Sequence, residues 1–415
     1  MARRLYTLFF FLCLPLILLR LLYRAIKAPA YARRWAERFA LGGDVRSGGI
    51  WVHAVSVGES IAAAPMVREL LKRYPALPIT VTCMTPTGSE QIRKLFGGQV
   101  GHAYLPYDLP WLQRRLLRRL QPKIGIIMET ELWPNLVAEA GRARVPLVLA
   151  NARLSARSAR GYQRVGALVR PMFAALDWVA VQSQAEALRF IELGVGREQM
   201  QVTGSIKFDF RPDPQQVQQA QELRARWGSD RPVWIAASTH AGEDEQVLRA
   251  HRQVLDTLPD ALLILVPRHP ERFDSVARQV SETGFGMVRR SSGAQQVLVG
   301  DTMGELVFLY ACADLAFVGG SLVPNGGHNY LEPAALGLPV LSGPHRFNFT
   351  EISELLEGAG ALQVVADETA LAVAVQQWLQ DSPARQRAGQ AGQAVVADNQ
   401  GALERLLQGI DRLLH

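Results

Sequence analysis

Cysteine is scarce in this chain of 415 residues, with Cys13, Cys83 and Cys312 far apart and no CxxC pair. Such spacing excludes a disulfide framework and a zinc knuckle, and it fits a reducing compartment. Internal repeats of solenoid length and a low-complexity tail are also missing from the sequence. The chain is therefore expected to fold around ordinary apolar cores, and its length suggests two large domains or three small ones.

Basic residues outnumber acidic ones, which gives a formal net charge of +7 and a pI near 9.5. An excess of this size is compatible with nucleic acid, an anionic membrane surface or a phosphorylated substrate as partner. Charge alone does not choose among these three classes.

Residues 5–19 carry no charge, although this run is shorter than the about 20 residues of a straight transmembrane helix. The small residues 28–30 make a cleaved signal peptide the alternative interpretation. Arg20, Arg24 and Lys27 stand where a signal peptide would be neutral, so the sequence favours an uncleaved anchor. The basic excess that follows predicts that the rest of the chain stays on the cytoplasmic side. Whether the segment spans the bilayer or lies in one leaflet is left open.

Apolar β-rich runs alternate with helical patterns along most of the chain, which predicts parallel sheets covered by helices in an α/β fold. The pattern breaks in the proline- and glutamine-rich residues 208–219, the predicted domain boundary. We expect an anchor and basic linker over 1–30, an N-terminal Rossmann-like domain over 31–210 and a C-terminal one over 211–415. Ligands of such sheets bind at the carboxyl ends of the strands, so a cleft between the two domains is expected to hold the site. The predicted strands cover 50–57, 78–85, 123–129, 145–151, 178–183, 232–239, 261–268, 286–290, 296–301, 315–320 and 338–343.

Three motifs of the first half contain candidate catalytic residues. Glu59 in SVGES opens a predicted helix directly after a strand, a position suited to a general base and equally common for an ordinary first-turn glutamate. Glu129 and Glu131 in METELWPN end an apolar strand, where a carboxylate needs a partner or a function. A helix cap beside Pro134 is an equal alternative for Glu131. Lys207 in TGSIKFD is a candidate to hold negative charge, with an ordinary surface lysine as the alternative.

The second half contains the candidate nucleotide site. Arg268 and His269 in PRHPER follow an apolar strand and suit a phosphate, against the alternative of a solvated turn. GDTMGEL (300–306) and the glycine-rich 319–340 segment resemble neither a P-loop nor a GxGxxG motif. Their glycines would let the backbone approach a phosphate, and a helix expected near Asn329 would present its N-terminus. Glu332 would then accept hydrogen bonds from ribose hydroxyls.

Two groups of arginines suit an anionic membrane surface or a phosphorylated lipid, and a solvated surface is the alternative. One lies on the predicted helix at 111–123 and the other just after 151. The arginines are Arg114, Arg115, Arg118, Arg119, Arg153, Arg157, Arg160 and Arg164.

In their order along the chain, METELWPN, PRHPER, GDTMGEL and GGHNYLEPA resemble the bacterial 3-deoxy-D-manno-octulosonic acid (Kdo) transferases, lipid A-modifying glycosyltransferases of the GT-B fold. The resemblance runs from the N-terminal anchor nearly to the end of the chain. It implies inverting, metal-independent transfer of Kdo from CMP-Kdo to a lipid A precursor, lipid IVA, in lipopolysaccharide core biosynthesis. It also implies no cofactor, no nucleic-acid partner, and residence on the cytoplasmic face of the inner membrane.

The resemblance also implies residue roles. Glu59 matches the family's proton acceptor, and Glu129 and Lys207 match its transition-state stabilisers. One departure is Tyr330, where many relatives carry proline. The residues that match the CMP-binding segments are Pro267, Arg268, Met303, Gly304, Glu305, Asn329, Tyr330, Leu331 and Glu332.

Two other interpretations remain open from the sequence. Another GT-B enzyme, such as a sugar-nucleotide epimerase or a UDP-sugar transferase, would need neither the basic anchor nor the arginine-rich helix. A non-catalytic membrane scaffold would bind nucleotide or anionic lipid and would not depend on Glu59. The number of Kdo residues added, the oligomeric state and the acyl chains tolerated are not predicted.

Overall fold

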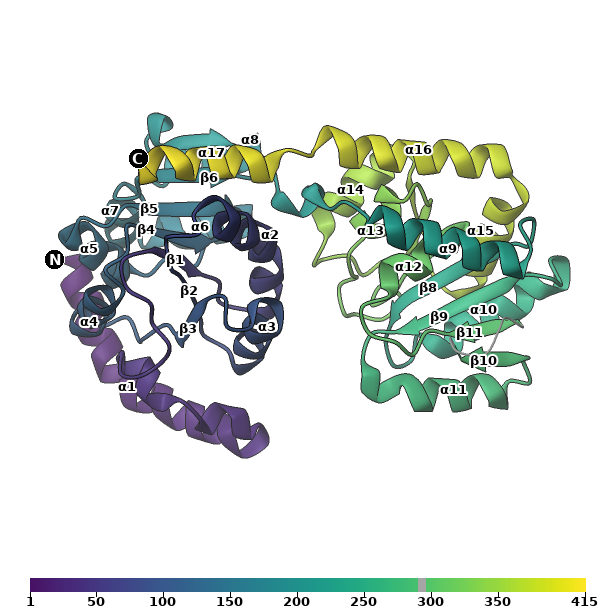
Figure 1. The fold of residues 1–415 in the computed structure, drawn as a ribbon, viewed down its shortest axis with the longest axis horizontal. Coiled ribbons are helices and arrows are strands. Elements are labelled where there is room, and N and C mark those ends of the chain that lie inside the picture. The colour runs from purple at the N-terminus through teal and green to yellow at the C-terminus, as the bar shows by residue number, and fades with distance from the viewer. Residues whose placement is uncertain (290–295) are drawn as a thin grey trace. The chain divides into compact units, whose positions relative to one another are not determined.

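The computed structural model describes residues 1–289 and 296–415, which form two compact units. The first unit contains Met1–Lys207 and Gln400–His415, and the second contains Phe208–Asn399 (Figure 1). Each unit is built on a parallel β-sheet with helices on both faces, so the predicted fold class, α/β with two Rossmann-like domains, is confirmed.

The first unit has a parallel sheet in the order β3-β2-β1-β4-β5-β6-β7. Its central strands are apolar runs buried on both faces, as expected when helices cover both sides. Strands β3 and β7 were not predicted, because they are short and contain few β-branched residues. The strands are β1 (Ile50–His53), β2 (Ile79–Cys83), β3 (Gly101–Tyr104), β4 (Ile124–Met128), β5 (Leu147–Ala152), β6 (Trp178–Val181) and β7 (Met200–Val202).

Helices of the first unit lie on the two faces of this sheet and make two apolar cores. Several begin at a serine or threonine whose side chain accepts a hydrogen bond from the first helical turn, which fixes where each helix starts. The α-helices are α1 (Ala2–Lys27), α2 (Val57–Arg73), α3 (Pro86–Phe96), α4 (Pro110–Leu120), α5 (Pro134–Ala143), α6 (Ala156–Arg164), α7 (Gly166–Phe173), α8 (Gln184–Glu192) and α17 (Ala402–Leu414). Short 3-10 helices cover Pro29–Ala32, Trp35–Phe39, Arg197–Gln199 and Ile206–Asp209.

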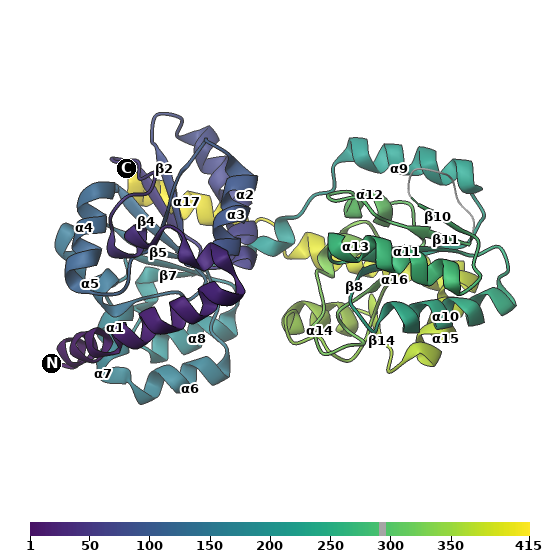
Figure 2. The same cartoon turned by 90° about the horizontal axis from the view of Figure 1, so that it is seen from below.

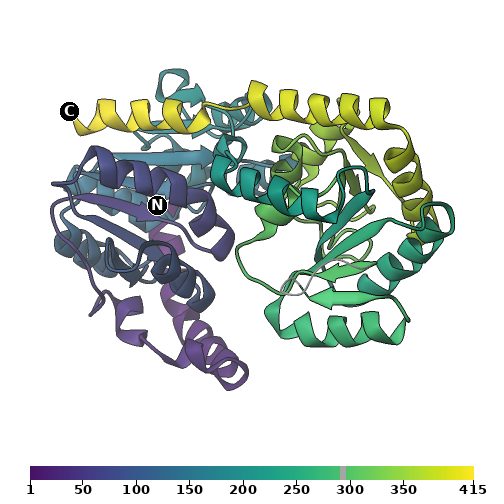
Figure 3. The same ribbon diagram turned by 45° about the vertical axis from the view of Figure 1, so that its right-hand side comes forward.

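The last helix, α17, belongs to the first unit, whereas residues 211–415 were expected to form one C-terminal domain. Leu406, Leu407 and Ile410 are buried in the same core as α2, and the yellow helix lies along the strands of the first unit in Figure 3. Gly409 faces Trp178 so closely that a Cβ atom there would lie 2.1 Å from the indole ring. The amphipathic pattern of α17 is typical of a packed helix, but it does not specify which sheet the helix covers.

Helix α1 is long and apolar enough to cross a membrane, and it runs along the first unit past α5 and α7 (Figure 2). One face packs against the unit, where Phe10 and Leu14 contact the apolar cluster around Leu112. Thr7 Oγ1 donates a hydrogen bond of 3.1 Å to Asn135 Oδ1 on α5. The opposite face exposes the large apolar side chains Leu5, Leu8, Phe9, Phe11, Leu12, Leu16, Leu19, Leu22, Tyr23 and Ile26.

The second unit has a parallel sheet whose described strands run in the order β10-β11-β9-β8-β12-β13-β14. The predicted strand at 286–290 is present as β10, and Arg290 lies outside the described residues. Strand β14 was not predicted. The strands are β8 (Val233–Thr239), β9 (Leu262–Pro267), β10 (Met287–Arg289), β11 (Val297–Val299), β12 (Leu315–Val318), β13 (Val340–Ser342) and β14 (Leu362–Val364).

Helices of the second unit enclose three apolar clusters around this sheet. The helix expected near Asn329 is α13, which is only five residues long. The described helices are α9 (Pro214–Trp227), α10 (Asp244–Thr257), α11 (Phe273–Glu282), α12 (Leu306–Tyr310), α13 (Leu331–Ala335), α14 (Thr350–Gly358), α15 (Glu368–Gln380) and α16 (Ser382–Asp398), with a 3-10 turn at Pro270–Arg272.

Candidate active site

Glu59 lies in the first turn of α2, and its N–H donates a hydrogen bond of 3.4 Å to the hydroxyl of the N-cap residue Ser56. Its carboxylate accepts a hydrogen bond of 2.9 Å from the Val55 N–H and one of 3.1 Å from the Ser56 hydroxyl. Only 9% of the residue is exposed. The expected position of a carboxylate at the mouth of a helix is therefore found, and the carboxylate also has a structural role there.

A second glutamate in the first turn of a helix of this unit, Glu186, makes similar hydrogen bonds. Glu186 at the start of α8 accepts a hydrogen bond of 2.9 Å from the Leu154 N–H and one of 3.1 Å from the hydroxyl of Ser183, its N-cap residue. Glu186 is 7% exposed. Each glutamate thus accepts from the hydroxyl of its N-cap serine and from one backbone N–H, although Val55 directly precedes the N-cap of α2 whereas Leu154 belongs to a distant segment.

Glu129 follows the last residue of β4 and has a φ angle of +56°, in the left-handed region. Residues other than glycine and asparagine are uncommon in the left-handed region, and this backbone conformation costs about 1–3 kcal/mol. The Glu129 N–H donates to the Ala150 carbonyl at 2.9 Å, which fixes the turn against β5. Glu129 Oε1 lies 3.9 Å from Lys207 Nζ, close enough for attraction and too far for a hydrogen bond.

The carboxylates at this edge of the first sheet influence one another. Burial raises the pKa of Glu59 to about 7; hydrogen bonds from Val55 and Ser56 oppose this rise, and the negative charges of Glu129 and Glu131 add to it. Burial and the charge of Glu129 also raise the pKa of Glu131. Glu59 is therefore poised to change protonation near neutral pH, which is the property required of a general base.

The helix-cap alternative for Glu131 is wrong. Helix α5 begins after Trp133 without a side-chain cap from its own segment. Asp108 caps it instead, accepting hydrogen bonds of 3.0 Å from the Asn135 N–H and 2.9 Å from the Leu136 N–H. Among the residues that the structure describes, the Glu131 carboxylate has no hydrogen-bond or ion-pair partner. Asp108 was missed from the sequence because it lies far from the helix that it caps.

Asn151 is a further residue that the sequence analysis missed. It has a φ angle of +52° at the end of β5, and its Oδ1 accepts a hydrogen bond of 3.1 Å from the Ile206 N–H. This bond fixes the backbone immediately before Lys207. The pattern of the apolar run around β5 gave no signal for it, because the decisive contact is with a segment 55 residues away.

In the second unit, Glu243 organises the glycine-rich loop. Its buried carboxylate accepts hydrogen bonds from the backbone N–H groups of His240, Gly320, Ser321 and Leu322 at 2.7–3.1 Å. A Cβ atom at Gly319 would lie 2.8 Å from Glu243 Oε2, so the glycine is required by this packing. The expectation that this part of the loop offers its N–H groups to a phosphate is therefore corrected, because a carboxylate of the chain already occupies them.

Glu243 was missed by the sequence analysis, since a glutamate at the start of a helix looks like many others.

The expectation that a helix near Asn329 presents its N-terminal dipole to a phosphate is also corrected. With five residues, α13 is too short to build a substantial macrodipole, and the Leu331 N–H already donates to Asn329 Oδ1 at 3.1 Å.

Arg268, Asn329 and Glu332 lie close together in the second unit. Asn329 Nδ2 donates a hydrogen bond of 3.0 Å to Glu332 Oε1. Burial raises the pKa of Glu332, and the Asn329 bond and the nearby positive charge of Arg268 oppose this rise. The Arg268 side chain is exposed at the end of β9, directly after buried Pro267. Its guanidinium has no hydrogen-bond or ion-pair partner among the described residues and is free to bind an anion.

The other predicted nucleotide-binding residues differ in exposure. Met303 is 57% exposed in the loop before α12, and Gly304 has a φ angle of +87° with open space around it. Glu305 accepts a hydrogen bond from the Thr302 hydroxyl. Tyr330 is fully buried, and its hydroxyl makes a hydrogen bond of 2.8 Å with Ser342 Oγ. The structure thus gives Tyr330 a packing role through its side chain, whereas only a backbone contribution was expected.

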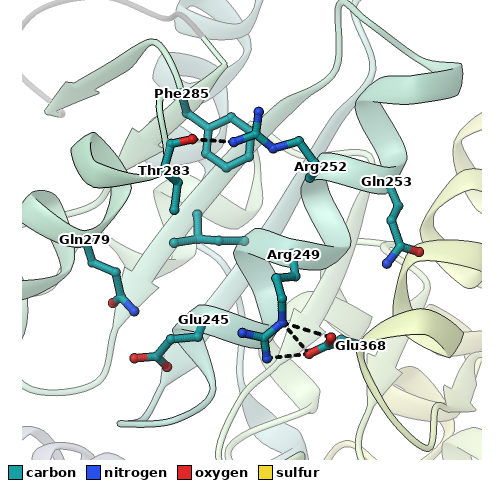
Figure 4. Close-up of a pocket in the computed structure, with 9 residues that line it drawn as sticks. Glu245, Arg249, Arg252, Gln253, Gln279, Thr283, Phe285 and Glu368 are labelled. Carbon is teal, nitrogen blue, oxygen red and sulfur yellow. Dashed lines mark hydrogen bonds and ion pairs between the residues drawn. The ribbon is translucent and has the colours of Figure 1, made fainter.

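A surface hollow of about 390 Å³ between α10 and α11 contains none of the predicted site residues (Figure 4). Arg249 there is paired with Glu368, and the Arg252 guanidinium lies 4.2 Å from the ring centre of Phe285. Across residues 1–289 and 296–415, no three His, Cys, Asp or Glu side chains are grouped as ligands for a metal ion.

Comparison with known proteins identifies the family. Residues 33–210 match the family described as 3-deoxy-D-manno-octulosonic-acid transferase (kdotransferase). The chain is 46% identical to the 3-deoxy-D-manno-octulosonic acid transferase of Haemophilus influenzae, over 98% of this chain and 97% of that protein. It is 40% identical to the Bordetella pertussis enzyme of the same name, over 99% of each chain.

Solved structures resemble the chain in fold. The UDP-GlcNAc 2-epimerase from Neisseria meningitidis, bound to UDP-GlcNAc, has a TM-score of 0.57 at 12% identity, covering 88% of this chain and 100% of that one. Anabaena Alr3699/HepE in complex with UDP has a TM-score of 0.56 at 14% identity, covering 88% and 99%. At such low identity the likeness extends to the fold alone. The near full-length identity to the two transferases goes further, and the chain belongs to the 3-deoxy-D-manno-octulosonic acid transferase family of glycosyltransferases.

Proposed function

We propose that this Kdo transferase takes Kdo from CMP-Kdo and attaches it to a lipid A precursor, lipid IVA, with inversion at the anomeric carbon and without a metal ion. The observation that carries the proposal is the Glu59 carboxylate, which has a pKa of about 7 in a chain of this family. A base with that pKa is partly ionised at neutral pH and accepts a proton more readily than an ordinary glutamate.

Glu59 would remove the proton of the acceptor hydroxyl as its oxygen attacks the anomeric carbon. The bond from the anomeric carbon to the phosphate oxygen breaks, and CMP leaves with the bonding electron pair. The proton stays on Glu59 and passes to solvent afterwards. The hydrogen bonds from Val55 and Ser56 hold the carboxylate in one orientation during this step.

Lys207, positioned by Glu129, would stabilise negative charge on the reacting groups in the same reaction. The Lys207 ammonium group suits the negative charge that the Kdo unit and the leaving phosphate carry. Glu129 Oε1 lies 3.9 Å from the Lys207 Nζ, so its negative charge attracts the lysine toward this position. Asn151 supports this arrangement through its bond to the Ile206 N–H.

The CMP group would be bound by the second unit, through Arg268 and the Asn329–Glu332 pair. Arg268 is exposed and unpaired among the described residues, and its planar guanidinium suits phosphate oxygens. The remaining residues proposed to bind CMP are Pro267, Met303, Gly304, Glu305, Tyr330 and Leu331.

Helix α1 would hold the enzyme on the cytoplasmic face of the inner membrane. One of its faces packs on the first unit while the other exposes large apolar side chains, an arrangement that favours a helix lying in one leaflet over one that spans. Trp111, 48% exposed, lies beside Phe11 and adds an aromatic side chain to this surface. Of the α4 arginines, Arg114 is paired with Glu139, and Arg115 and Arg119 donate to backbone carbonyls, so these three also have structural roles. The exposed Arg153, Arg157, Arg160 and Arg164 remain available to anionic lipid.

The test is to incubate the purified chain with CMP-Kdo and tetra-acylated lipid A precursor and to weigh the lipid product by mass spectrometry. The expected result is one or more added Kdo units, with CMP released. An unchanged lipid mass would contradict the proposal. Supplying UDP-sugars in place of CMP-Kdo tests the alternative of another GT-B activity. E59A should lose turnover while it keeps its fold and its nucleotide affinity. A wild type that binds nucleotide without any turnover would favour the non-catalytic scaffold.

A further inference from the structure

Two histidines of the second unit share a hydrogen bond. His240 follows β8 and His328 follows the glycine-rich loop, and their Nε2 atoms lie 2.8 Å apart. The planes of the two rings differ by only 4°, so the bond lies close to both ring planes. His269 faces the edge of His240, with ring centres 5.4 Å apart and planes at 81°.

A bond between two Nε2 atoms limits where protons can be. One Nε2 carries the proton and donates, and the other must be deprotonated and accept. The accepting ring, when neutral, therefore has its own proton on Nδ1. The donating ring can take up one further proton on its Nδ1 without breaking the bond. The pair thus offers one N–H donor when neutral and a second one, with a positive charge, after protonation.

The surroundings of the pair are suited to an anion. A Cβ atom at Gly320 would lie 3.1 Å from the His328 ring and 3.4 Å from the His240 ring, so the backbone approaches the pair closely. The backbone N–H groups of Gly320, Ser321 and Leu322 already donate to Glu243, so these three are not available to a phosphate beside the pair. The charged and titratable groups facing the pair are Arg268, His269, Arg272, Glu243 and Asp244.

We propose that His240 and His328, together with Arg268, bind the phosphate of the nucleotide, and that the pair takes up a proton when the phosphate binds. This inference rests on the proposed CMP-Kdo donor and adds two residues to its binding site. After transfer, the phosphate of the released CMP carries one more negative charge than the diester of the donor. A histidine pair that gains a proton and a positive charge therefore stabilises the CMP product more than the donor.

The electrostatics of the pair agree with this assignment. Burial lowers the pKa of His328 to about 3, helped by the positive charge of Arg268. Burial and the neighbouring His269, Arg272 and Arg268 also lower the pKa of His240. The unliganded pair is therefore uncharged at neutral pH. A bound anion raises the pKa of an adjacent imidazole, so binding takes up protons, and affinity gains as the pH falls.

The test is calorimetric titration of the full chain with CMP at pH 6.5 and pH 8.0, for the wild type, H328Q and H240Q. Each variant is expected to bind CMP about tenfold more weakly at pH 6.5, as for the loss of a hydrogen bond to a charged group. The loss should shrink at pH 8.0. Because the ligand is the same throughout, its own titration cancels in the comparison. In the wild type at pH 8.0, where the CMP phosphate is already almost fully ionised, titrations in two buffers of different ionisation enthalpy should show net proton uptake.

Equal CMP affinity in the wild type and both variants would overturn the inference, as would the same loss at both pH values. Thermal unfolding identifies a variant that fails to fold, and in that case an absence of proton uptake in the wild type overturns the inference by itself. If the wild type does not bind CMP, the donor assignment fails as well. If it binds CMP and the variants behave like it, only the role of the histidine pair fails.

Discussion

Lys207 Nζ lies 3.9 Å from Glu129 Oε1, and this pair joins a strained turn after β4 to the segment at the end of the first unit. Both side chains are partly exposed, at 29% and 20%, so the pair contributes little to folding. The pair is therefore better tested through its effect on the rate of transfer than through its effect on the free energy of unfolding.

Replacing Lys207 by methionine separates the two roles. We expect K207M to lose about 10²-fold or more in kcat/KM, because a positive charge near the reacting centre is removed. Its thermal unfolding midpoint should stay within a few degrees of the wild type, as for an exposed ion pair of about 0–1 kcal/mol. Steady-state assays and a thermal melt measure both quantities. Full activity in K207M would contradict the role given to the lysine.

Glu186 provides a control for Glu59, because both glutamates lie in the first turn of a helix and accept from the N-cap serine hydroxyl and one backbone N–H. We expect E59Q and E186Q each to destabilise the chain by about 1 kcal/mol, since each weakens a hydrogen bond to a largely buried carboxylate. Only E59Q should lose turnover, by about 10²–10⁴-fold, the usual contribution of a general base. Denaturant unfolding and initial rates decide the matter. Similar turnover rates in E59Q and E186Q would show that Glu59 only stabilises the start of α2 and is not the general base.

The pH profile should report the raised pKa of Glu59. The base is active when ionised, so kcat/KM of the wild type should rise with pH through about 7. Glu131 raises this pKa through its negative charge, and E131Q removes that charge. The rising limb of E131Q should therefore move to lower pH. A limb that moves to higher pH, or one that is unchanged, would show that Glu131 is not ionised beside Glu59.

Glu243 should be essential to the second unit. Its carboxylate accepts four backbone hydrogen bonds, and a glutamine would direct an NH₂ group toward some of these donors. We expect E243Q to lower the free energy of unfolding by about 3 kcal/mol or more, because buried donors are left unpaired. Nucleotide affinity should fall with it. Chemical unfolding followed by Trp fluorescence gives the first quantity, and CMP titration gives the second.

The contact of α17 with the first unit can be tested by adding one methyl group. A Cβ atom at Gly409 would lie 2.1 Å from the Trp178 ring, so G409A should destabilise the chain by about 1–3 kcal/mol through overpacking. Gly141 on α5 is the control, because a Cβ there meets nothing within 4 Å. G141A should be neutral or slightly stabilising, by about 0.5–1 kcal/mol. Equal melts for the two variants would contradict the packing of α17.

The sequence predicted most of the strands, because apolar runs that are buried on both faces have a clear pattern. It also singled out Glu59, Glu129 and Arg268 as candidates, since charged residues close after such runs stand out, and their roles remain predictions. The strands β3, β7 and β14 were missed because they are short and each contains at most one β-branched residue, so no β-rich run marks them. Local patterns could not reveal that Glu243 binds a loop about 80 residues away, or that Asp108 caps α5, because both contacts join distant parts of the chain.

The helix-cap interpretation of Glu131 and the helix dipole near Asn329 failed for a related reason. The first assumed that a helix is capped by residues that flank it in sequence. The second assumed a helix of ordinary length. In the structure a carboxylate from another loop caps α5, and α13 ends after five residues. Sequence patterns indicate clearly which face of a helix or strand is apolar. They indicate less clearly where the helix or strand ends and which residues cap it.

The return of residues 400–415 to the first unit has a consequence for synthesis on the ribosome. A nascent chain that has just completed the second unit still lacks the helix that covers Trp178 and one face of the first sheet. The N-terminal half therefore carries an uncovered apolar surface until α17 has been made, while the inserted half can already close its own core. A chain that stops early would leave that surface open to chaperones and proteases.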